Sequence, residues 1–485
     1  MQYILSEHEP RAALRYFEEI SAIPRGSGNE EAISDYLMAF AAQNGLNAYR
    51  DQAWNVYITK PASKGYENLP PIVLQGHTDM VCEKNQNVEH DFKKDPIQLV
   101  LEGNILRANG TTLGADNGVA VSWMMAILTD DSLIHPPLEC VFTACEEVGL
   151  IGAHNLEFDR ISGRRLLNLD CGPEGTFCCG SAGGQVTDLV LPIHRETMHG
   201  IPLTLRLRGL SGGHSGGLIH KYLGNANQLM ARILYNVFRS THCCVAQIDG
   251  GDKANAIPRE CDAQIVLEST QLQTALDAIK ATEKAIAGQL MPQDSAFHIE
   301  TETAAACDIS VITSRSTDLL LRLMTLVPNG PQLRDLTMDN RVVASENFAS
   351  VHTDEKNVTL VISMRSSNDA YREDMALRLE TLAQFAGAAV RHHDDYDSWE
   401  IEKHSALRQT LLNCYEKLNG KKGKVVATHG GLECGIFQKR LPGVDLVTMC
   451  CNSSGAHSPD ERMELDSYAR CYELLKAVLR ELCNA

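Results

Sequence analysis

Short apolar runs alternate with helical stretches through the first 185 residues or so, and this alternation constrains the fold most strongly. The apolar runs at 71–75, 138–144 and 165–169 are predicted to be buried strands. Residues 117–128 are apolar on nearly all faces and free of proline, so we expect a buried helix there. Strands that alternate with helices indicate βαβ units around a parallel sheet. The chain is therefore predicted to be an α/β protein.

The pattern changes after a glycine-rich stretch near residue 183. Residues 203–209 alternate apolar and polar side chains with a period of two, which is typical of a strand exposed on one face. The βα pattern returns near residue 398. We predict an N-terminal part of the α/β domain at 1–185, an inserted α+β domain with an antiparallel sheet at 186–397, and a C-terminal part of the α/β domain at 398–485.

Charge and cysteine content argue against several classes of partner. The chain has 44 Lys and Arg against 62 Asp and Glu, a net charge of −18, which repels nucleic acid and anionic lipid. No stretch approaches the roughly 20 apolar residues of a membrane span, and the first residues carry no apolar signal core. The 16 cysteines form no C-x-x-C pair and are expected to be buried free thiols. We expect a cytoplasmic protein that binds neither nucleic acid nor membranes.

The first predicted strand ends in Gly76-His77-Thr78-Asp79. Alternation along the strand turns His77 and Asp79 the same way, so the carboxylate can lie near the imidazole. Carboxylates orient metal-bound histidines in this manner. Taken alone, the triplet is more readily explained as a polar loop.

Acidic residues also follow the other predicted strands or precede the predicted buried helix. Asp116 stands immediately before the buried helix, where an aspartate is commonly an N-cap. Glu146 and Glu147 follow the second predicted strand, and Asp170 follows the third. Adjacent carboxylates repel each other unless a cation compensates them, although a solvated acidic turn is the alternative for this pair. Together these groups lie at the edge where open α/β sheets place their active sites.

A second histidine, His457, lies in the loop at 454–462 before the last predicted helix. With His77 and the carboxylates at the strand ends, it completes a nitrogen and oxygen donor set suited to zinc. His429 and Glu433 are also four residues apart, but we interpret them as structural or substrate-adjacent rather than as a ligand pair.

The formal charges of these groups suit two metal ions. Three carboxylates and a bridging hydroxide would neutralise two Zn²⁺ ions. One ion is expected to bind His77 and Asp170 and the other Glu147 and His457, with Asp116 and the hydroxide shared. Each ion then has the four ligands that zinc prefers.

In these motifs the sequence resembles the di-zinc dipeptidase and aminoacylase family of metallopeptidases. The motifs at 76–80, 114–118, 146–147, 168–170 and 456–462 match those of the family in order, across essentially the whole chain. The resemblance implies a catalytic domain with a mixed sheet flanked by helices, and the five metal ligands assigned above. It also implies Glu146 as the general base and Asp79 as the residue that orients His77. Manganese or cobalt can serve in place of zinc in such enzymes.

The resemblance further implies that the insert is a lid domain that contacts the substrate and forms a homodimer interface. His214, in the run Gly212-Gly-His-Ser-Gly-Gly217, is expected to help hold the scissile carbonyl oxygen. Asn255 and Arg365 are expected to bind the terminal carboxylate of the substrate, a task that suits the planar guanidinium group. The glycine-rich run is no phosphate-binding loop, because no G-K-[ST] follows it.

The expected activity is hydrolysis of unblocked dipeptides, in particular Xaa-His dipeptides such as β-alanyl-histidine. The metal-bridging hydroxide would attack the carbonyl carbon while Glu146 takes up the proton. One alternative is a deacylase of N-acyl amino acids that uses the same metals. Another is a catalytically silent metal-binding protein, against which the joint presence of Glu146, Asp79 and His214 argues.

Overall fold

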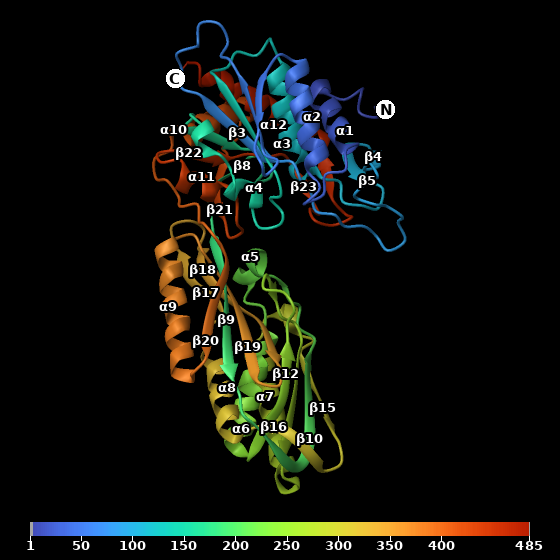
Figure 1. Ribbon diagram of the computed structural model, residues 1–485, viewed down its shortest axis with the longest axis vertical. Helices are drawn as coiled ribbons and strands as arrows, with labels where there is room; N and C mark the ends of the chain where they lie inside the picture. The colour runs from blue at the N-terminus through green and yellow to red at the C-terminus, as the bar shows by residue number, and fades with distance from the viewer. Residues whose placement is uncertain (1–2, 485) are drawn as a thin grey trace. The chain divides into compact units, whose positions relative to one another are not determined.

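The computed structural model describes residues 3–484, which divide into two compact units (Figure 1). Unit 1 comprises the chain up to Ser181, Trp399–Thr428 and the chain from Leu432 onward. Unit 2 comprises Ala182–Ser398 and His429–Gly431. Segments from both ends of the sequence, blue and red in Figure 1, thus build unit 1 together.

Unit 1 is built on a six-stranded mixed sheet. Strand β3 is parallel to both its neighbours β6 and β7, β22 is parallel to β7, and β1 and β2 are antiparallel. Along the sheet the strands are β1 (Asn47–Arg50), β2 (Val56–Lys60), β6 (Leu138–Thr143), β3 (Ile72–His77), β7 (Arg165–Asn168) and β22 (Asp445–Thr448). All six residues of β3 are buried, as expected of a central parallel strand covered on both faces.

Helices flank this sheet and share one hydrophobic core with it. The predicted buried helix is confirmed as α3, in which Trp123 is fully buried and packs on Tyr468 of α12 with ring centroids 5.3 Å apart. The longer helices of unit 1 are α1 (Arg11–Ser21), α2 (Glu31–Gln43), α3 (Ala115–Thr129), α10 (Ala406–Asn419) and α12 (Leu465–Glu481). The shorter ones are α4 (Ile151–His154) and α11 (Cys434–Arg440). The remaining strands are β4 (Leu99–Glu102), β5 (Ile105–Ala108), β8 (Thr176–Ser181), β21 (Lys424–Thr428), β23 (Ser453–Ser454) and β24 (Arg462–Glu464).

Unit 2 is built on a large antiparallel sheet. Leu203, Leu205 and Leu207 are fully buried while the residues between them are partly exposed, which confirms the predicted period of two. Its strands are β9 (Gly183–Pro192), β10 (Arg195–Arg208), β12 (Cys243–Gly250), β14 (Cys261–Leu267), β15 (His298–Thr303), β16 (Cys307–Ile312), β17 (Gly330–Asp335), β18 (Arg341–Thr353), β19 (Asn357–Ser366) and β20 (Ala389–Tyr396).

Helices cover one face of that sheet and bury a second hydrophobic core against it. They are α6 (Ala226–Ser240), α7 (Leu272–Ala287), α8 (Ser314–Leu326) and α9 (Asp369–Ala386). A short segment with β11 (Gly213–His214), α5 (Ser215–Leu218) and β13 (Ala256–Ile257) lies beside the sheet. Within residues 3–484, no helix combines the length and apolar character that a membrane span requires.

Candidate metal centre

Seven acidic or imidazole groups gather at one edge of the sheet in unit 1. Because β3 is parallel to β6 and β7, the carboxyl ends of all three strands meet at this edge. His77 is the last residue of β3 and Asp79 lies just after it. Glu146 and Glu147 follow β6, Asp170 follows β7, and Asp116 lies in the first turn of α3. His457 comes from the loop between β23 and β24. The seven are His77, Asp79, Asp116, Glu146, Glu147, Asp170 and His457.

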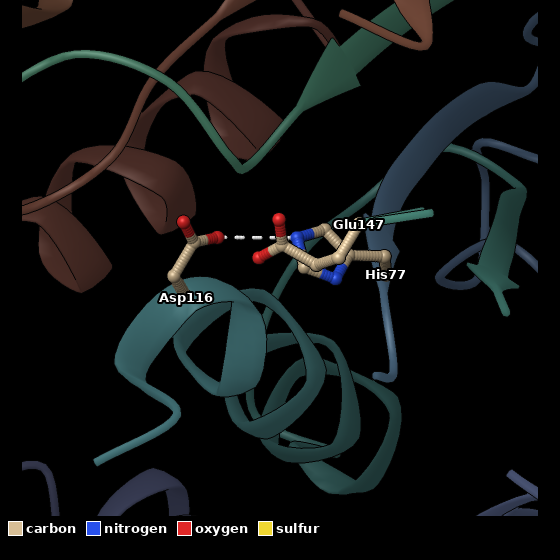
Figure 2. A group of neighbouring side chains, drawn as sticks. All are labelled: His77, Asp116 and Glu147. Carbon is tan, nitrogen blue, oxygen red and sulfur yellow. Dashed lines mark hydrogen bonds and ion pairs between the residues drawn. The ribbon is translucent and has the colours of Figure 1, made fainter. Parts of the chain in front are cut away.

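Asp116 lies between the two histidines. Its Oδ1 is 3.1 Å from Nε2 of His77, and its Oδ2 is 3.3 Å from Nε2 of His457. Figure 2 shows Asp116 at the start of α3, with its carboxylate directed toward His77. One carboxylate therefore faces both imidazoles, which is the position that a ligand shared by two ions would take.

Each histidine has a further carboxylate of its own. Oδ1 of Asp170 is 3.7 Å from Nε2 of His77, and Oε1 of Glu147 is 3.0 Å from Nε2 of His457. The structure thus brings all five predicted ligands together in two groups that share Asp116. Donor atoms of His77, Asp116 and Glu147 all lie within 4.8 Å of one another, close enough to hold one ion.

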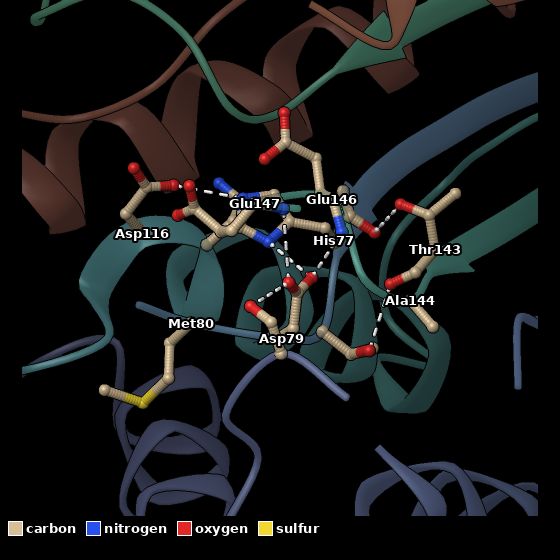
Figure 3. Close-up of polar contacts among 12 residues, drawn as sticks. His77, Asp79, Met80, Asp116, Thr143, Ala144, Glu146 and Glu147 are labelled. Atoms are coloured by element: carbon tan, nitrogen blue, oxygen red, sulfur yellow. Dashed lines mark hydrogen bonds and ion pairs between the residues drawn. The ribbon is translucent and has the colours of Figure 1, made fainter. Parts of the chain in front are cut away.

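Asp79 connects His77 to the loop that carries the two glutamates. Its Oδ1 is 3.2 Å from Nδ1 of His77, and the carboxylate is fully buried. The main-chain N–H groups of Glu146 and Glu147 donate to it at 2.9 and 3.2 Å, and the Ser27 hydroxyl donates at 2.8 Å. In Figure 3 the Glu146 side chain extends away from Asp79. The predicted base and the predicted first ligand are therefore held by the same carboxylate.

The two imidazoles lie in strongly negative surroundings. Burial by itself lowers the pKa of His77, but hydrogen bonds to Asp116 and Asp79 outweigh burial and raise the pKa well above its usual range. Hydrogen bonds to Asp116 and Glu147 raise the pKa of His457 to about 10. Both shifts mean that this edge of the sheet favours positive charge.

The pKa values of the carboxylates also show that negative charge is in excess at this site. Burial raises the pKa of Asp170 well above its usual range, and the neighbouring charge of Asp116 adds to the shift. Burial also raises the pKa of Glu146, and Asp170 adds to that shift although His77 opposes it. A divalent cation would remove the repulsion between these groups, and zinc binds this kind of nitrogen and oxygen donor set. The residues present therefore fit a divalent metal ion.

A buried glutamate that the sequence reasoning assigned no role holds the loop of Asp116. Oε2 of Glu461 accepts the main-chain N–H groups of Leu113 and Gly114 at 2.8 and 2.9 Å, and Oε1 accepts that of Asp116 at 3.1 Å. Glu461 belongs to the motif at 456–462, so an acidic residue in that loop was a usable signal. It aligns the chain that leads into α3.

A buried arginine, also missed, ties two of the ligand loops together. Arg25 is 2% exposed and donates to the main-chain oxygens of Thr78, Asp79 and Gly114 at 2.9, 3.1 and 2.5 Å. These oxygens belong to the loop after His77 and the loop before Asp116. Nothing in the local sequence around Arg25 indicates this role, because its partners lie far along the chain.

The predicted substrate-binding residues all lie in unit 2, around α5. His214 precedes α5, and the main-chain N–H of Ser215 donates to the carbonyl oxygen of Asn255 at 2.8 Å. A Cβ atom at Gly216 would lie 2.9 Å from Cε1 of His214 and 3.3 Å from Cζ of Arg365. His214, Asn255 and Arg365 therefore form one cluster within unit 2.

His429 and Glu433 fall into separate networks. His429 belongs to unit 2, where its Nε2 is 2.7 Å from the hydroxyl oxygen of Ser345. Glu433 belongs to unit 1, where it contacts Gln75 and Thr143.

Comparison with known proteins assigns the family. Residues 73–481 match the peptidase family M20/M25/M40, and the chain belongs to this family of metallopeptidases. The predicted resemblance, the predicted fold class and the prediction of an enzyme are thereby confirmed.

Two of the similar proteins are more than 30% identical to the chain over nearly its full length. It is 34% identical over 480 residues to the cytosol non-specific dipeptidase of Escherichia coli (strain K12), covering 99% of each protein. The crystal structure of aminoacylhistidine dipeptidase from Vibrio alginolyticus has a TM-score of 0.90 with 32% identity, covering 98% of each chain. A tripeptidase from Staphylococcus aureus, at 15% identity, a TM-score of 0.57 and coverage of 99% and 100%, shares the fold.

Proposed function

We propose that this metallopeptidase hydrolyses unblocked dipeptides, including Xaa-His dipeptides such as β-alanyl-histidine. The observation that carries the proposal is the Asp116 carboxylate between His77 and His457, with one further carboxylate beside each histidine. The similarity to a non-specific dipeptidase and to an aminoacylhistidine dipeptidase supports the substrate class.

Two zinc ions per chain are proposed as the cofactor, with manganese or cobalt as substitutes. His77 and Asp170 would hold one ion, Glu147 and His457 the other, and Asp116 both. When bound, the ions would polarise the scissile carbonyl group and lower the pKa of water held between them.

Glu146 is proposed as the general base. It is partly buried, and its main-chain N–H is anchored on Asp79. Its carboxylate would accept the proton of the attacking water and deliver it to the amine that leaves. Burial favours a carboxylate that can take up this proton, because burial stabilises the neutral form.

The cluster in unit 2 is proposed to bind the rest of the substrate. His214 would donate to the carbonyl oxygen as negative charge develops on it. Asn255 and Arg365 would bind the C-terminal carboxylate, Arg365 through two parallel N–H groups. A requirement for a free carboxylate so close to the scissile bond would favour dipeptides over longer peptides. We also propose that residues 186–397 act as a lid domain and homodimer interface, and that the enzyme works in the cytoplasm.

A substrate panel with product analysis tests the proposal. The purified protein would be assayed on β-alanyl-histidine, other Xaa-His and non-His dipeptides, a tripeptide, a dipeptide amide and N-acetyl amino acids. We expect two free amino acids from each dipeptide and little reaction with the amide. Faster cleavage of N-acetyl amino acids than of any dipeptide would instead indicate a deacylase with the same metal site.

Metal removal provides the matching control. Protein stripped with chelator should lose activity on every substrate, and added Zn²⁺, Mn²⁺ or Co²⁺ should restore it. Metal analysis of the freshly purified protein should give two divalent ions per chain. Undiminished cleavage after complete stripping would contradict the metal-dependent mechanism.

A further inference from the structure

Glu433 is a buried carboxylate that lies outside the proposed ligand set. It is 1% exposed and stands just before α11. The Glu433 side chain makes no capping hydrogen bond to this helix. Instead its Oε2 accepts from Nε2 of Gln75 at 2.5 Å and from the Thr143 hydroxyl at 2.8 Å.

These contacts place Glu433 directly beneath the candidate metal centre. Gln75 lies two residues before His77 on β3, so the two side chains point to the same face of the sheet. Thr143 is the register partner of His77 on β6. Both Gln75 and Thr143 are fully buried. Glu433 therefore contacts the layer of side chains immediately below the proposed ligands.

The same layer extends to the strand that carries Asp170. Nδ2 of Asn168 donates to Oε1 of Gln75 at 2.7 Å, and Oδ1 of Asn168 accepts the main-chain N–H of Asp170 at 3.3 Å. A continuous set of hydrogen bonds thus runs from Glu433 through β3 to the chain that bears Asp170.

Hydrogen bonding does not explain why this residue is a carboxylate. Both donors meet a single oxygen, Oε2, while Oε1 has no hydrogen-bond partner among residues 3–484. A glutamine could accept the same two hydrogen bonds without a buried charge. Burial raises the pKa of the Glu433 carboxyl to about 7, against the opposing effects of His77, Thr143 and Gln75, and no lysine or arginine is among the groups that act on it most strongly.

A buried charge is costly unless an opposite charge compensates it. Glu433 interacts electrostatically with His77 and is among the charges that act on Asp170, the two residues assigned to one ion. Electrostatic attraction extends beyond direct contact in a buried site, because the interior screens it weakly. A divalent cation held by His77 and Asp170 is the compensating charge within reach of this layer.

We propose that Glu433 is a positioning residue for the metal centre, whose buried negative charge strengthens the binding of a divalent cation at His77 and Asp170 without contacting it. The inference rests on the proposed function for the existence of that metal site. It assigns no ligand bond to Glu433 and is independent of which peptide is cleaved.

Two variants at this position distinguish the effect of the negative charge from the effect of side-chain length. Glu433→Gln keeps the length of the side chain and an oxygen for Gln75 and Thr143, but it removes the charge. Glu433→Asp keeps the charge but shortens the side chain, so it cannot reach both donors. Glu416→Gln, on the exposed face of α10, is the matched control for the same chemical change.

The readout is the affinity of the stripped full-length protein for Zn²⁺, measured by competition with a chromophoric chelator. We expect Glu433→Gln to weaken binding by about 10- to 100-fold, the range usual for residues around metal ligands. Glu433→Asp should bind more tightly than Glu433→Gln, and Glu416→Gln should match the parent. Activity of Glu433→Gln on β-alanyl-histidine should return toward the parental kcat when Zn²⁺ is raised, with KM for the dipeptide unchanged.

Parental Zn²⁺ affinity in Glu433→Gln would overturn the proposal, as would tighter binding by the Gln variant than by the Asp variant. If Glu433→Gln unfolds when stripped, the comparison of Zn²⁺ affinity between Glu433→Asp and the parent replaces it. Zn²⁺ binding more than about 100-fold weaker in Glu433→Asp would assign the role to hydrogen bonding and overturn the proposal. Because Zn²⁺ affinity needs no substrate, failure of the dipeptidase assignment alone would leave this result interpretable.

Discussion

Oδ1 of Asp79 lies 3.2 Å from Nδ1 of His77. The same carboxylate receives the main-chain N–H groups of Glu146 and Glu147. One buried group therefore orients the imidazole of a proposed ligand and holds the loop of the proposed base. A change at Asp79 is expected to affect both metal binding and catalysis.

Replacing Asp79 by asparagine should weaken both functions. The amide nitrogen would face a donor, either the His77 ring or a main-chain N–H, so part of the present network would be lost. We expect Zn²⁺ affinity and kcat/KM to fall by about 10- to 100-fold each. Ser27→Ala, which removes one hydrogen bond from Asp79 but leaves the carboxylate, is the milder control. An Asp79→Asn protein that binds zinc like the parent would contradict the orienting role.

Glu146 and Glu147 should respond differently to the same substitution. Glu146→Gln or Glu146→Ala should retain both metal ions but lose kcat by about 10²- to 10⁴-fold, because the proton acceptor is gone. Glu147→Gln should instead lose metal, since Glu147 is a proposed ligand beside His457. Metal analysis and steady-state rates on β-alanyl-histidine would distinguish the two. Normal hydrolysis by either Glu146 variant would show that another group is the base.

Replacing Glu461 should weaken metal binding, because Glu461 holds the loop that carries Asp116. Glu461→Gln turns an N–H donor toward the main-chain N–H groups of Leu113, Gly114 or Asp116, so the start of α3 should shift. We expect Zn²⁺ affinity to fall by about 10-fold or more, because Asp116 is the proposed shared ligand. The exposed neighbour Asp460 offers the control, as Asp460→Asn should leave zinc binding unchanged. Equal affinities in the two variants would count against this role.

The stability of the stripped protein should fall as the pH rises. The folded state raises the pKa of His457 from 6.5 to about 10, so its contribution to stability is fully present below pH 6.5 and is lost as the pH rises through 10. The raised pKa values of Asp170 and Glu146 act in the same direction, because their neutral forms are favoured in the fold. The side chain of His457 is 52% exposed, so solvent screening reduces its part.

Thermal unfolding in chelator, measured from pH 6.5 to 10, tests this expectation. The midpoint should fall across the range, and less steeply in His457→Gln. Zn²⁺ should raise the midpoint more at the higher pH values, because a metal ligand must be deprotonated. A midpoint that rises with pH in chelator would be incompatible with the assigned electrostatics.

Local patterns were sufficient for the elements that carry the site. The apolar runs at 71–75, 138–144 and 165–169 correspond closely to β3, β6 and β7, since a strand buried on both faces needs a continuous apolar sequence. The pattern was less informative in unit 2, where β18 mixes small, polar and apolar residues. Strands β17 and β19 are the neighbours of β18 along the chain, but its pairing with β12, at Gly250 and Val351, joins segments distant in sequence.

Strand alternation and strand direction are local properties, so the pattern of residues was enough to predict which side chains lie at the ends of the parallel strands. The pattern also identified the donor types that suit a divalent cation. That Asp116 faces both His77 and His457 depends on the three-dimensional fold, since 341 residues separate Asp116 from the second histidine. The fold likewise decided that Arg25, Glu433 and Glu461 support the centre, because distances between groups so far apart in sequence depend on how the whole chain packs.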